Sequence, residues 1–179
     1  MSRKLLISIH LILAAFFAPI LILIGVSGGL YLMGEKGHVE KQEIYKGELA
    51  GYDFANKDRA SQVREFIKAQ NIDHEFEYIR GGSDFAITRP TSKEHYLFEL
   101  DGEQLVVTKR TPNVISTIVE LHKGHGPTGF KTLQKLTALG LFIIIISGLY
   151  LGITSPSLRN KTAAITGLGF IVTLWFAFL

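Results

Sequence analysis

Three long stretches without a charged side chain constrain what this chain can fold into. No Asp, Glu, Lys or Arg occurs from Leu5 to Gly34, from Leu136 to Leu158, or from Thr162 to Leu179. About 20 apolar residues in a helix cross the roughly 30 Å hydrocarbon core of a bilayer. The first two stretches exceed that length and the third just reaches it. The pattern predicts an integral membrane protein whose charged residues are concentrated between Glu35 and Lys135.

The first stretch follows Arg3 and Lys4, an arrangement that also occurs in secretory signals. A signal has an apolar core of about 7–15 residues and ends at a small-x-small cleavage site. Here the apolar run is about twice that length, and no such motif precedes Glu35. We therefore expect an uncleaved membrane helix. Pro19 lies inside it, which membrane helices tolerate.

The charged part of the chain has the pattern of a compact α+β domain. Extended segments are predicted at 39–47 and 48–52, and residues 56–71 show the apolar spacing of a helix. Further strands are predicted at 74–79, 85–89, 96–100 and 105–109, with turns at Gly81-Gly82-Ser83 and Asp101-Gly102. An amphipathic helix over 114–123 then returns to the membrane surface and ends at a glycine-rich turn.

Together these patterns predict a membrane protein of α+β class, with three transmembrane helices and the α+β domain inserted between helices 1 and 2. The predicted parts are a first transmembrane helix (1–34), the domain (35–112), an interfacial helix and turn (113–129), a second transmembrane helix (130–154) and a third (162–179). Basic residues before the first span and between the second and third spans favour a cytoplasmic location for both. That orientation places the domain outside, although lysines on the other side weaken the bias.

Composition excludes several classes of function. The chain has no cysteine, which excludes disulfides, Cys–zinc sites and Cys-ligated iron–sulfur clusters. The net charge is +3 without a basic block, so no nucleic acid is expected as a partner. The domain shows no nucleophile–base pattern, and we predict no catalytic side chain in it.

The histidines are the remaining candidates for functional side chains. Of the six histidines, His10 lies inside the first span, where it is the only ionisable side chain other than tyrosine. It follows Lys4 by six residues, roughly 9 Å along a helix, which places it below the headgroups. Ionisable groups at membrane depth are costly and are usually functional. The alternatives are a hydrogen bond to a neighbouring helix or snorkelling to the interface.

His122 and His125 lie just before the second span, on the opposite side of the membrane from His10. By themselves they would form an interfacial pair in a glycine-rich turn. However, the two spans end in similar sequences, Ser27-Gly28-Gly29-Leu30-Tyr31-Leu32 and Ser147-Gly148-Leu149-Tyr150-Leu151. The spans run in opposite directions, so each of these small-residue patches lies where the other span begins.

Glycine in a membrane helix allows the close approach of another helix or of a flat ring. We expect His10 level with Gly148, and His122 and His125 near the level of Gly28. Imidazole is an axial ligand of haem iron, and glycine would make room for the porphyrin plane. The pattern therefore favours haem at two levels, roughly 25 Å apart along the first span. The alternative for the glycines is plain helix packing through small-xxx-small motifs.

The remaining histidines give less information about a functional site. One chain offers a single histidine at the inner level, so ligation by two histidines there would need His10 of a second copy and favours a two-fold homodimer. His38 is either a second outer ligand or, as we favour, a loop residue. His74 and His95 fall in or beside predicted strands and are expected to be structural or surface groups.

The flanks of the spans resemble the PepSY-associated transmembrane proteins. The matching stretches are Arg3-Lys4-Leu5 through His10, Gly25–Leu32, Glu120-Leu121-His122, and Ser147–Leu151; the helix–hairpin–hairpin order of Asn56–Lys109 is similar to a PepSY domain. That family includes inner-membrane reductases that bind b-type haem through membrane histidines and reduce ferric iron, often from siderophores, with the soluble part in the periplasm. The resemblance implies His10 and His122 as iron ligands, with His125 next. This chain is much shorter than typical members.

From the resemblance we expect a haem b protein of the bacterial inner (cytoplasmic) membrane that reduces ferric iron or a ferric chelate on the periplasmic side and so supports iron uptake. Its electrons would come from a quinol or a cytoplasmic reductant. The alternative is a non-enzymatic membrane-anchored binding or regulatory module that contacts a peptidase or transporter. A further alternative is an accessory subunit of a larger transporter, whose spans bind partner helices.

Overall fold

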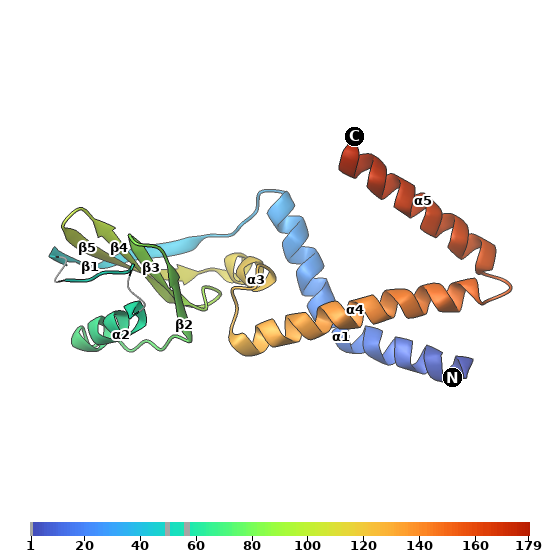
Figure 1. Ribbon diagram of the computed structural model, residues 1–179, viewed down its shortest axis with the longest axis horizontal. Coiled ribbons are helices and arrows are strands. Elements are labelled where there is room, and N and C mark those ends of the chain that lie inside the picture. The colour runs from blue at the N-terminus through green and yellow to red at the C-terminus, as the bar shows by residue number, and fades with distance from the viewer. Residues whose placement is uncertain (1, 49–50, 56–57) are drawn as a thin grey trace. The chain divides into compact units, whose positions relative to one another are not determined.

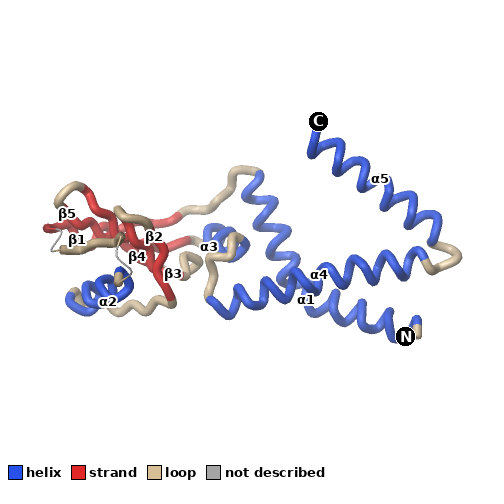
Figure 2. Tube along the Cα trace, in the orientation of Figure 1, coloured by secondary structure: helices blue, strands red, loops and turns tan. Residues whose placement is uncertain are grey.

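The computed structural model describes residues 2–48, 51–55 and 58–179 of the chain. It divides into two compact units, one made of Met1–Leu21 with Lys135–Leu179 and the other of Ile22–Gln134. Helices α1 (Arg3–Leu32) and α4 (Thr128–Ile153) each contribute residues to both units. Figures 1 and 2 show the order of the helices and strands along the chain.

Three helices in the described residues are long and apolar enough to cross a membrane: α1, α4 and α5 (Arg159–Phe178). None of the residues of α5 is buried within the protein, as expected of a helix whose sides face lipid. Pro19 lies inside α1 and has no N–H for the carbonyl of the preceding turn. The three apolar helices confirm the predicted membrane class.

Helices α1 and α4 pack closely because one of them has a residue without a side chain at the contact. A Cβ built on Gly140 of α4 would overlap the ring of Phe17 of α1. Phe17 is correspondingly buried, as are Ile20 and Thr137. Between helices in a bilayer, such small-residue contacts replace the hydrophobic driving force that operates in water. This contact positions the first half of α1 against α4.

The domain between α1 and α4 contains a five-stranded antiparallel sheet in the order β1-β5-β4-β3-β2. The strands are β1 (Val39–Glu48), β2 (Tyr78–Gly81), β3 (Phe85–Arg89), β4 (His95–Asp101) and β5 (Gln104–Pro112). Strands β2 to β5 form two successive hairpins, whereas β1 arrives from α1 and pairs with β5 at the sheet edge. This sheet confirms the predicted α+β fold.

The two faces of the sheet have different compositions because successive side chains of a strand point to opposite faces. One face carries Phe98 and Val107, which form the hydrophobic core with Val63 and Phe66 of helix α2 (Arg59–Ala69). Aromatic rings of Phe66 and Phe98 meet edge to face at 5.4 Å between centroids. This core holds the domain together.

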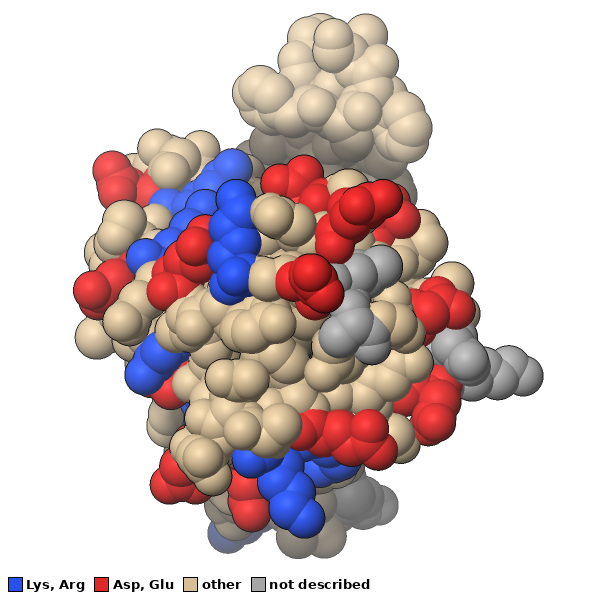
Figure 3. Space-filling view, turned by 90° about the vertical axis from the view of Figure 1, so that its left-hand side faces the viewer, with Lys and Arg blue, Asp and Glu red and all other residues tan. Residues whose placement is uncertain are grey.

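The opposite face carries Arg89, His95 and Arg110, which alternate with core residues on their strands. These side chains line a cavity on this face of the sheet, and residues of helix α3 (Val114–His122) line its other side. A surface view of the domain shows acidic and basic side chains interspersed, with neither sign dominating the face in view (Figure 3). That mixture is typical of a surface in contact with water.

Two of the segment predictions are wrong. The strand predicted at 74–79 begins at Tyr78, because His74 and Phe76 turn their rings toward the core edge, where the His74 ring lies 4.6 Å from that of Tyr96. The segment predicted as extended at 48–52 leaves the sheet after Glu48 and has a glycine in the left-handed region at Gly51. Residues 49 and 50 of that segment, and residues 56 and 57 of the predicted helix, lie outside the described residues.

The first turn of α4 is held against the domain by side-chain contacts. The carboxylate of Glu77 accepts hydrogen bonds from the backbone N–H, at 2.8 Å, and the hydroxyl of Thr128. These bonds lower the pKa of Glu77 and satisfy a free N–H at the start of α4. The ammonium of Lys131 lies against the hydroxyl and ring of Tyr78. The domain thus anchors the first turn of α4.

Candidate functional site

His10 of α1 lies against the Ser147-Gly148 pair of α4. Its Nδ1 is 2.8 Å from the Ser147 hydroxyl oxygen. Its Cε1 is 3.3 Å from the position that a Cβ on Gly148 would occupy. The absence of a side chain at Gly148 therefore allows the imidazole to approach α4 and reach the neighbouring serine.

The hydrogen bonds of Ser147 determine which nitrogen of His10 carries the proton. The Ser147 hydroxyl donates to the carbonyl of Ile144 at 3.1 Å, and a hydroxyl has only one hydrogen to donate. With the hydroxyl hydrogen directed at the carbonyl of Ile144, the oxygen of Ser147 accepts the N–H of Nδ1. That assignment gives the neutral ring a proton on Nδ1 and a lone pair on Nε2. Among the described residues, Nε2 of His10 has no hydrogen-bond partner.

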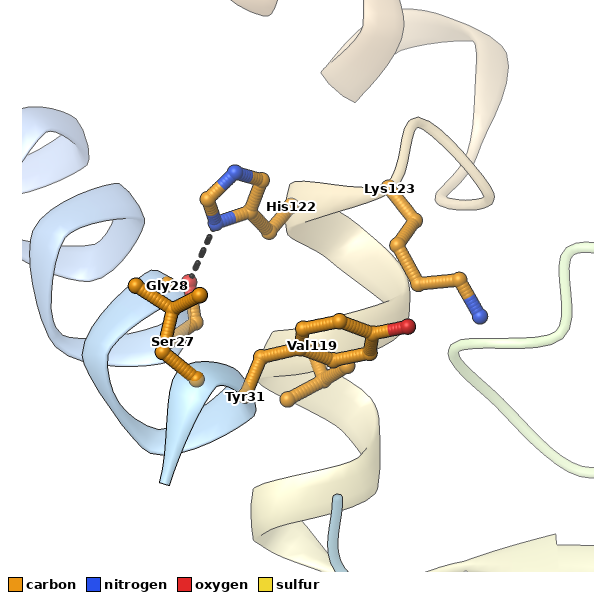
Figure 4. A pocket seen from close by; sticks show the side chains of 7 residues that line it. Ser27, Gly28, Tyr31, Val119, His122 and Lys123 are labelled. Carbon is orange, nitrogen blue, oxygen red and sulfur yellow. Dashed lines mark hydrogen bonds between the residues drawn. The ribbon is translucent and has the colours of Figure 1, made fainter. Parts of the chain in front are cut away.

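His122, the last residue of α3, repeats this arrangement with Ser27 and Gly28 of α1. Its Nδ1 is 2.9 Å from the Ser27 hydroxyl oxygen, and its Cε1 is 3.1 Å from a Cβ built on Gly28. Figure 4 shows the imidazole and the serine side chain pointing toward one another from the two helices. Ser27 donates to the carbonyl of Leu23 at 2.7 Å, so it too accepts from Nδ1–H. Nε2 again has no hydrogen-bond partner in the described part of the chain.

Each histidine–serine pair adjoins a cavity. The cavity beside His122 has a volume of about 410 Å³ and is lined by Ser27, Gly28, Tyr31, Leu32, Val119, His122 and Lys123 (Figure 4). A second cavity of about 410 Å³ is lined by Leu6, Phe142, Ile143, Ile146, Ser147 and Tyr150. Both linings are mainly apolar; His122 itself lines the first cavity, whereas the second is lined by Ser147 but not by His10 or Gly148. Such composition suits a largely apolar planar ligand.

Helix α3 is held in place at both ends, which fixes His122. Asn113 caps its start by accepting the N–H of Ser116 at 2.9 Å, and it also accepts the N–H of His38 at 3.1 Å. At the other end the side-chain amide of Gln134 donates to the carbonyl of Leu121 at 2.8 Å. His38 enters this arrangement through its backbone, in agreement with its interpretation as a loop residue.

The structure places His125 away from the Ser27–His122 pair. Its Nδ1 lies 2.7 Å from a carboxylate oxygen of Glu120, which also accepts the hydroxyl of Thr91 at 2.6 Å. The other oxygen of Glu120 accepts from Lys123 at 2.6 Å. Burial alone would raise the pKa of Glu120, but the hydrogen bonds from Lys123, Thr91 and His125 outweigh it and lower the pKa to about 2. His125 thus belongs to a charged network on the domain side of α3.

These donor sets fit haem better than a bare metal ion. Among the described residues, no group of three or more His, Asp or Glu side chains gathers as ion ligands would. Each pair instead offers one imidazole with a free Nε2 lone pair, and its Nδ1–H is oriented by a second residue. Histidines that ligate metals almost always donate their other N–H in this way. In their chemistry, one histidine at each of the two sites would suit a ligand of haem iron.

Sequence reasoning did not assign a role to the two serines, although both belong to the repeated stretches that it compared. The dipeptide Ser-Gly, which occurs in both of these stretches, could have indicated their role, because each copy lies at the level where a histidine was expected. Gly28 and Gly148 both give room to an imidazole ring, and Gly28 also lines the cavity beside His122. Their predicted role beside a porphyrin plane stays a prediction.

The fold and the site together define a helical membrane protein with an inserted antiparallel α+β domain and histidines paired with serine–glycine steps. The chain matches the family model described as PepSY-associated TM region over residues 7–176, and it therefore belongs to this family. The predicted resemblance is confirmed. Comparisons with curated proteins and with solved structures found no match.

Proposed function

We propose that this protein binds haem b in the membrane and transfers electrons to ferric iron or a ferric chelate on the periplasmic side of a bacterial inner membrane, in support of iron uptake. The observation that carries the proposal is the repeated geometry of His10 with Ser147-Gly148 and of His122 with Ser27-Gly28. A histidine that only packs between helices needs one hydrogen bond, which its ring can either donate or accept. Two histidines whose Nε2 lone pairs are both left open are what haem ligation requires.

In this proposal His10 and His122 would hold the haem iron through Nε2. Bound haem supplies reversible one-electron chemistry at its iron. Ser147 and Ser27 hold the rings in orientation and increase the basicity of Nε2 by accepting from Nδ1–H. Apolar side chains such as Phe142 and Ile146 exclude water from the inner cavity. We assign no acid–base catalyst, because electron transfer requires none.

The same proposal includes a homodimer. The unit formed by Met1–Leu21 and Lys135–Leu179 contains a single histidine, His10. Two-histidine ligation at that site therefore needs His10 of a second copy, most simply across a two-fold axis. Electrons would enter from a quinol or a cytoplasmic reductant. The domain that extends from β1 to β5 along the chain would contact the ferric acceptor outside the membrane.

A spectroscopic experiment on the full chain tests the proposal. The protein is expressed with haem supplied, purified in detergent, and its absorption spectrum is recorded before and after dithionite. We expect a Soret band and sharp bands in the reduced form, and we expect the reduced protein to return to the oxidised spectrum when ferric citrate is added. A matched control is His74→Ala, because His74 lies in the domain core edge and should leave the spectrum unchanged.

The outcome also distinguishes the main alternative. A colourless preparation, or a spectrum unaffected by His10→Ala and His122→Ala, would contradict haem ligation at these residues. The membrane-anchored binding or regulatory module would then be the better account of the chain. A haem spectrum without oxidation by ferric chelates would retain the cofactor and remove the ferric acceptor from the proposal.

A further inference from the structure

A further cavity lies within the domain, on the face of the sheet opposite the hydrophobic core. It has a volume of about 250 Å³ and is lined by Val39, Ile87, Arg89, Thr91, His95, Arg110, Ser116, Glu120, Lys123 and His125. The strands place its basic residues in one row, since Arg110 of β5 is directly opposite His95 of β4. Helix α3 contributes Ser116 and Glu120 from the other side. This cavity is distinct from the one beside His122, although Lys123 lines both.

Positive charge exceeds negative charge in this cavity. Among the described residues that line it, Arg89, Arg110 and Lys123 are permanent cations, and Glu120 is the one carboxylate. Glu120 is within 4 Å of the charged groups of Arg89 and Lys123, at 3.9 and 2.6 Å. Arg110 has no carboxylate within ion-pair distance in the described part of the chain. Its charge is left without a counterion on a partly buried face.

The arginines also have unused hydrogen-bond donors. The Nε–H groups of Arg89 and Arg110 are both buried, and neither has a hydrogen-bond partner among the described residues. A buried donor on a charged group is costly to leave unpaired. Arg89 does use another donor, which bonds Thr91 at 2.7 Å, so its side chain is fixed rather than free to turn outward. Arg89 and Arg110 therefore each have a buried donor that an acceptor oxygen atom in the cavity would satisfy.

We propose that this cavity binds a small oxyanion, that is, a carboxylate or phosphate group. Guanidinium groups bind both through paired N–H donors and opposite charge. The hydroxyl of Ser116 and the imidazole of His95 add polar groups at the wall. The Nδ1–H of His95 donates to the carbonyl of Lys93 at 2.8 Å, which fixes the orientation of its ring. This site does not depend on haem, and the inference stands independently of the proposed electron transfer.

Calorimetric titration of the detergent-purified full chain tests the inference. Phosphate and citrate are titrated separately at low ionic strength, with chloride at the same ionic strength as the reference. We expect saturable binding of at least one of the two anions at one site per chain. The response to phosphate against citrate then identifies whether the site prefers a phosphate or a carboxylate.

Variants connect the binding to the cavity. Arg110→Gln should weaken binding roughly 10- to 100-fold, the loss typical of a hydrogen bond to a charged group. Arg110→Lys keeps the charge but loses the planar pair of donors, so we expect intermediate affinity. Lys68→Gln removes the same charge from the exposed side of helix α2 and should bind as the native chain does. A thermal unfolding curve for each variant verifies that it is folded.

Two results would overturn the inference. One is the absence of binding of both anions by the folded native chain. The other is binding that Arg110→Gln and Arg89→Gln leave unchanged, since the anion would then be held elsewhere on the protein.

Discussion

The two histidine–serine pairs have the same local chemistry in different surroundings. Beside Ser147, the hydrogen-bond partner of His10, a cavity is lined by apolar side chains of α1 and α4 apart from Ser147 and the hydroxyl of Tyr150. Around His122, the cavity includes Lys123, and the helix that carries His122 also carries Glu120 with its charged network. The difference shows that the same histidine–serine pair is supported by different neighbouring residues at the two sites. The Ser147 hydroxyl and the packing of α1 against α4 position the ring of His10, whereas the Ser27 hydroxyl and a helix capped by Asn113 position that of His122.

The largest expected effect is the loss of a ligand. His10→Ala and His122→Ala should each retain about half of the haem that the native chain binds, because each removes the imidazole that the chain contributes to one of the two proposed sites. The remaining haem in the two variants should differ in reduction potential, since one site is apolar and the other lies near charged groups. Haem per chain and redox titration of the reduced bands measure both quantities. Identical residual spectra and potentials would contradict two separate sites.

Replacing the serines tests the orientation of the imidazole rings separately from their ligation of iron. Ser147→Ala and Ser27→Ala retain the histidines but lose the acceptor for Nδ1–H, and we expect roughly 10- to 100-fold weaker haem affinity for each. The loss should be larger for Ser147→Ala, because no water is available in the hydrocarbon core to replace the hydroxyl. Haem titration into haem-free protein measures the affinities. The matched control is Ser61→Ala, on α2 and away from both sites. Equal affinity in the native and Ser147→Ala chains would show that the serine does not support a ligand.

Glu120 has no counterpart beside His10, so its removal should affect one site. Glu120→Gln should lower the free energy of unfolding by about 1–3 kcal/mol at neutral pH, since Lys123, Thr91 and His125 lose a charged acceptor. It should weaken haem binding at His122 and leave the His10 site unchanged.

The stabilisation by Glu120 also has a defined pH dependence. The folded protein lowers the pKa of this carboxyl from 4.5 to about 2, so its contribution is complete above pH 4.5 and decreases as the pH falls toward 2. The difference in unfolding midpoint between the native chain and Glu120→Gln, measured by circular dichroism, should narrow over that range. A difference that is constant with pH would contradict the assigned network.

The smallest effects are expected at the glycines. Gly28→Ala and Gly148→Ala would each place a methyl group 3.1 and 3.3 Å from an imidazole Cε1, which requires the ring to move by a few tenths of an ångström. We expect about 1 kcal/mol of destabilisation and a small shift in the haem spectrum. Gly29→Ala is the matched control, because a Cβ there has no neighbour within 4 Å. A spectral change as large in Gly29→Ala as in Gly28→Ala would contradict the contact.

Much of the fold follows from local patterns in the sequence. The charge-free stretches predict α1, α4 and α5 because hydrocarbon requires long apolar helices, and the Asp101-Gly102 turn predicts the β4–β5 hairpin. The pairing of β1 with β5 was not predicted, since it joins residues far apart in the chain and depends on how the whole domain closes. The strand predicted at 74–79 is wrong for its first residues because packing of His74 against the core competes with sheet pairing.

The candidate site was predicted in part. His10 and His122 were identified because imidazole inside or beside a span is unusual, and the repeated small residues pointed to their partners. The roles of Ser27 and Ser147 depend on rotamers and on a carbonyl one turn earlier, which spacing along the chain does not specify. The separation of His125 from His122 depends on Glu120, five residues before His125, and on a turn with Gly124 in the left-handed region.

The central claim is that both rings present the Nε2 lone pair to a ligand. It is tested most directly by nitrogen-15 NMR of the haem-free protein labelled at histidine, with the resonances assigned through His10→Ala and His122→Ala. We predict that His10 and His122 both show a protonated Nδ1 and an unprotonated Nε2 at neutral pH. A proton on Nε2 of either ring would contradict the hydrogen-bond assignment and remove that histidine as a ligand held ready for iron.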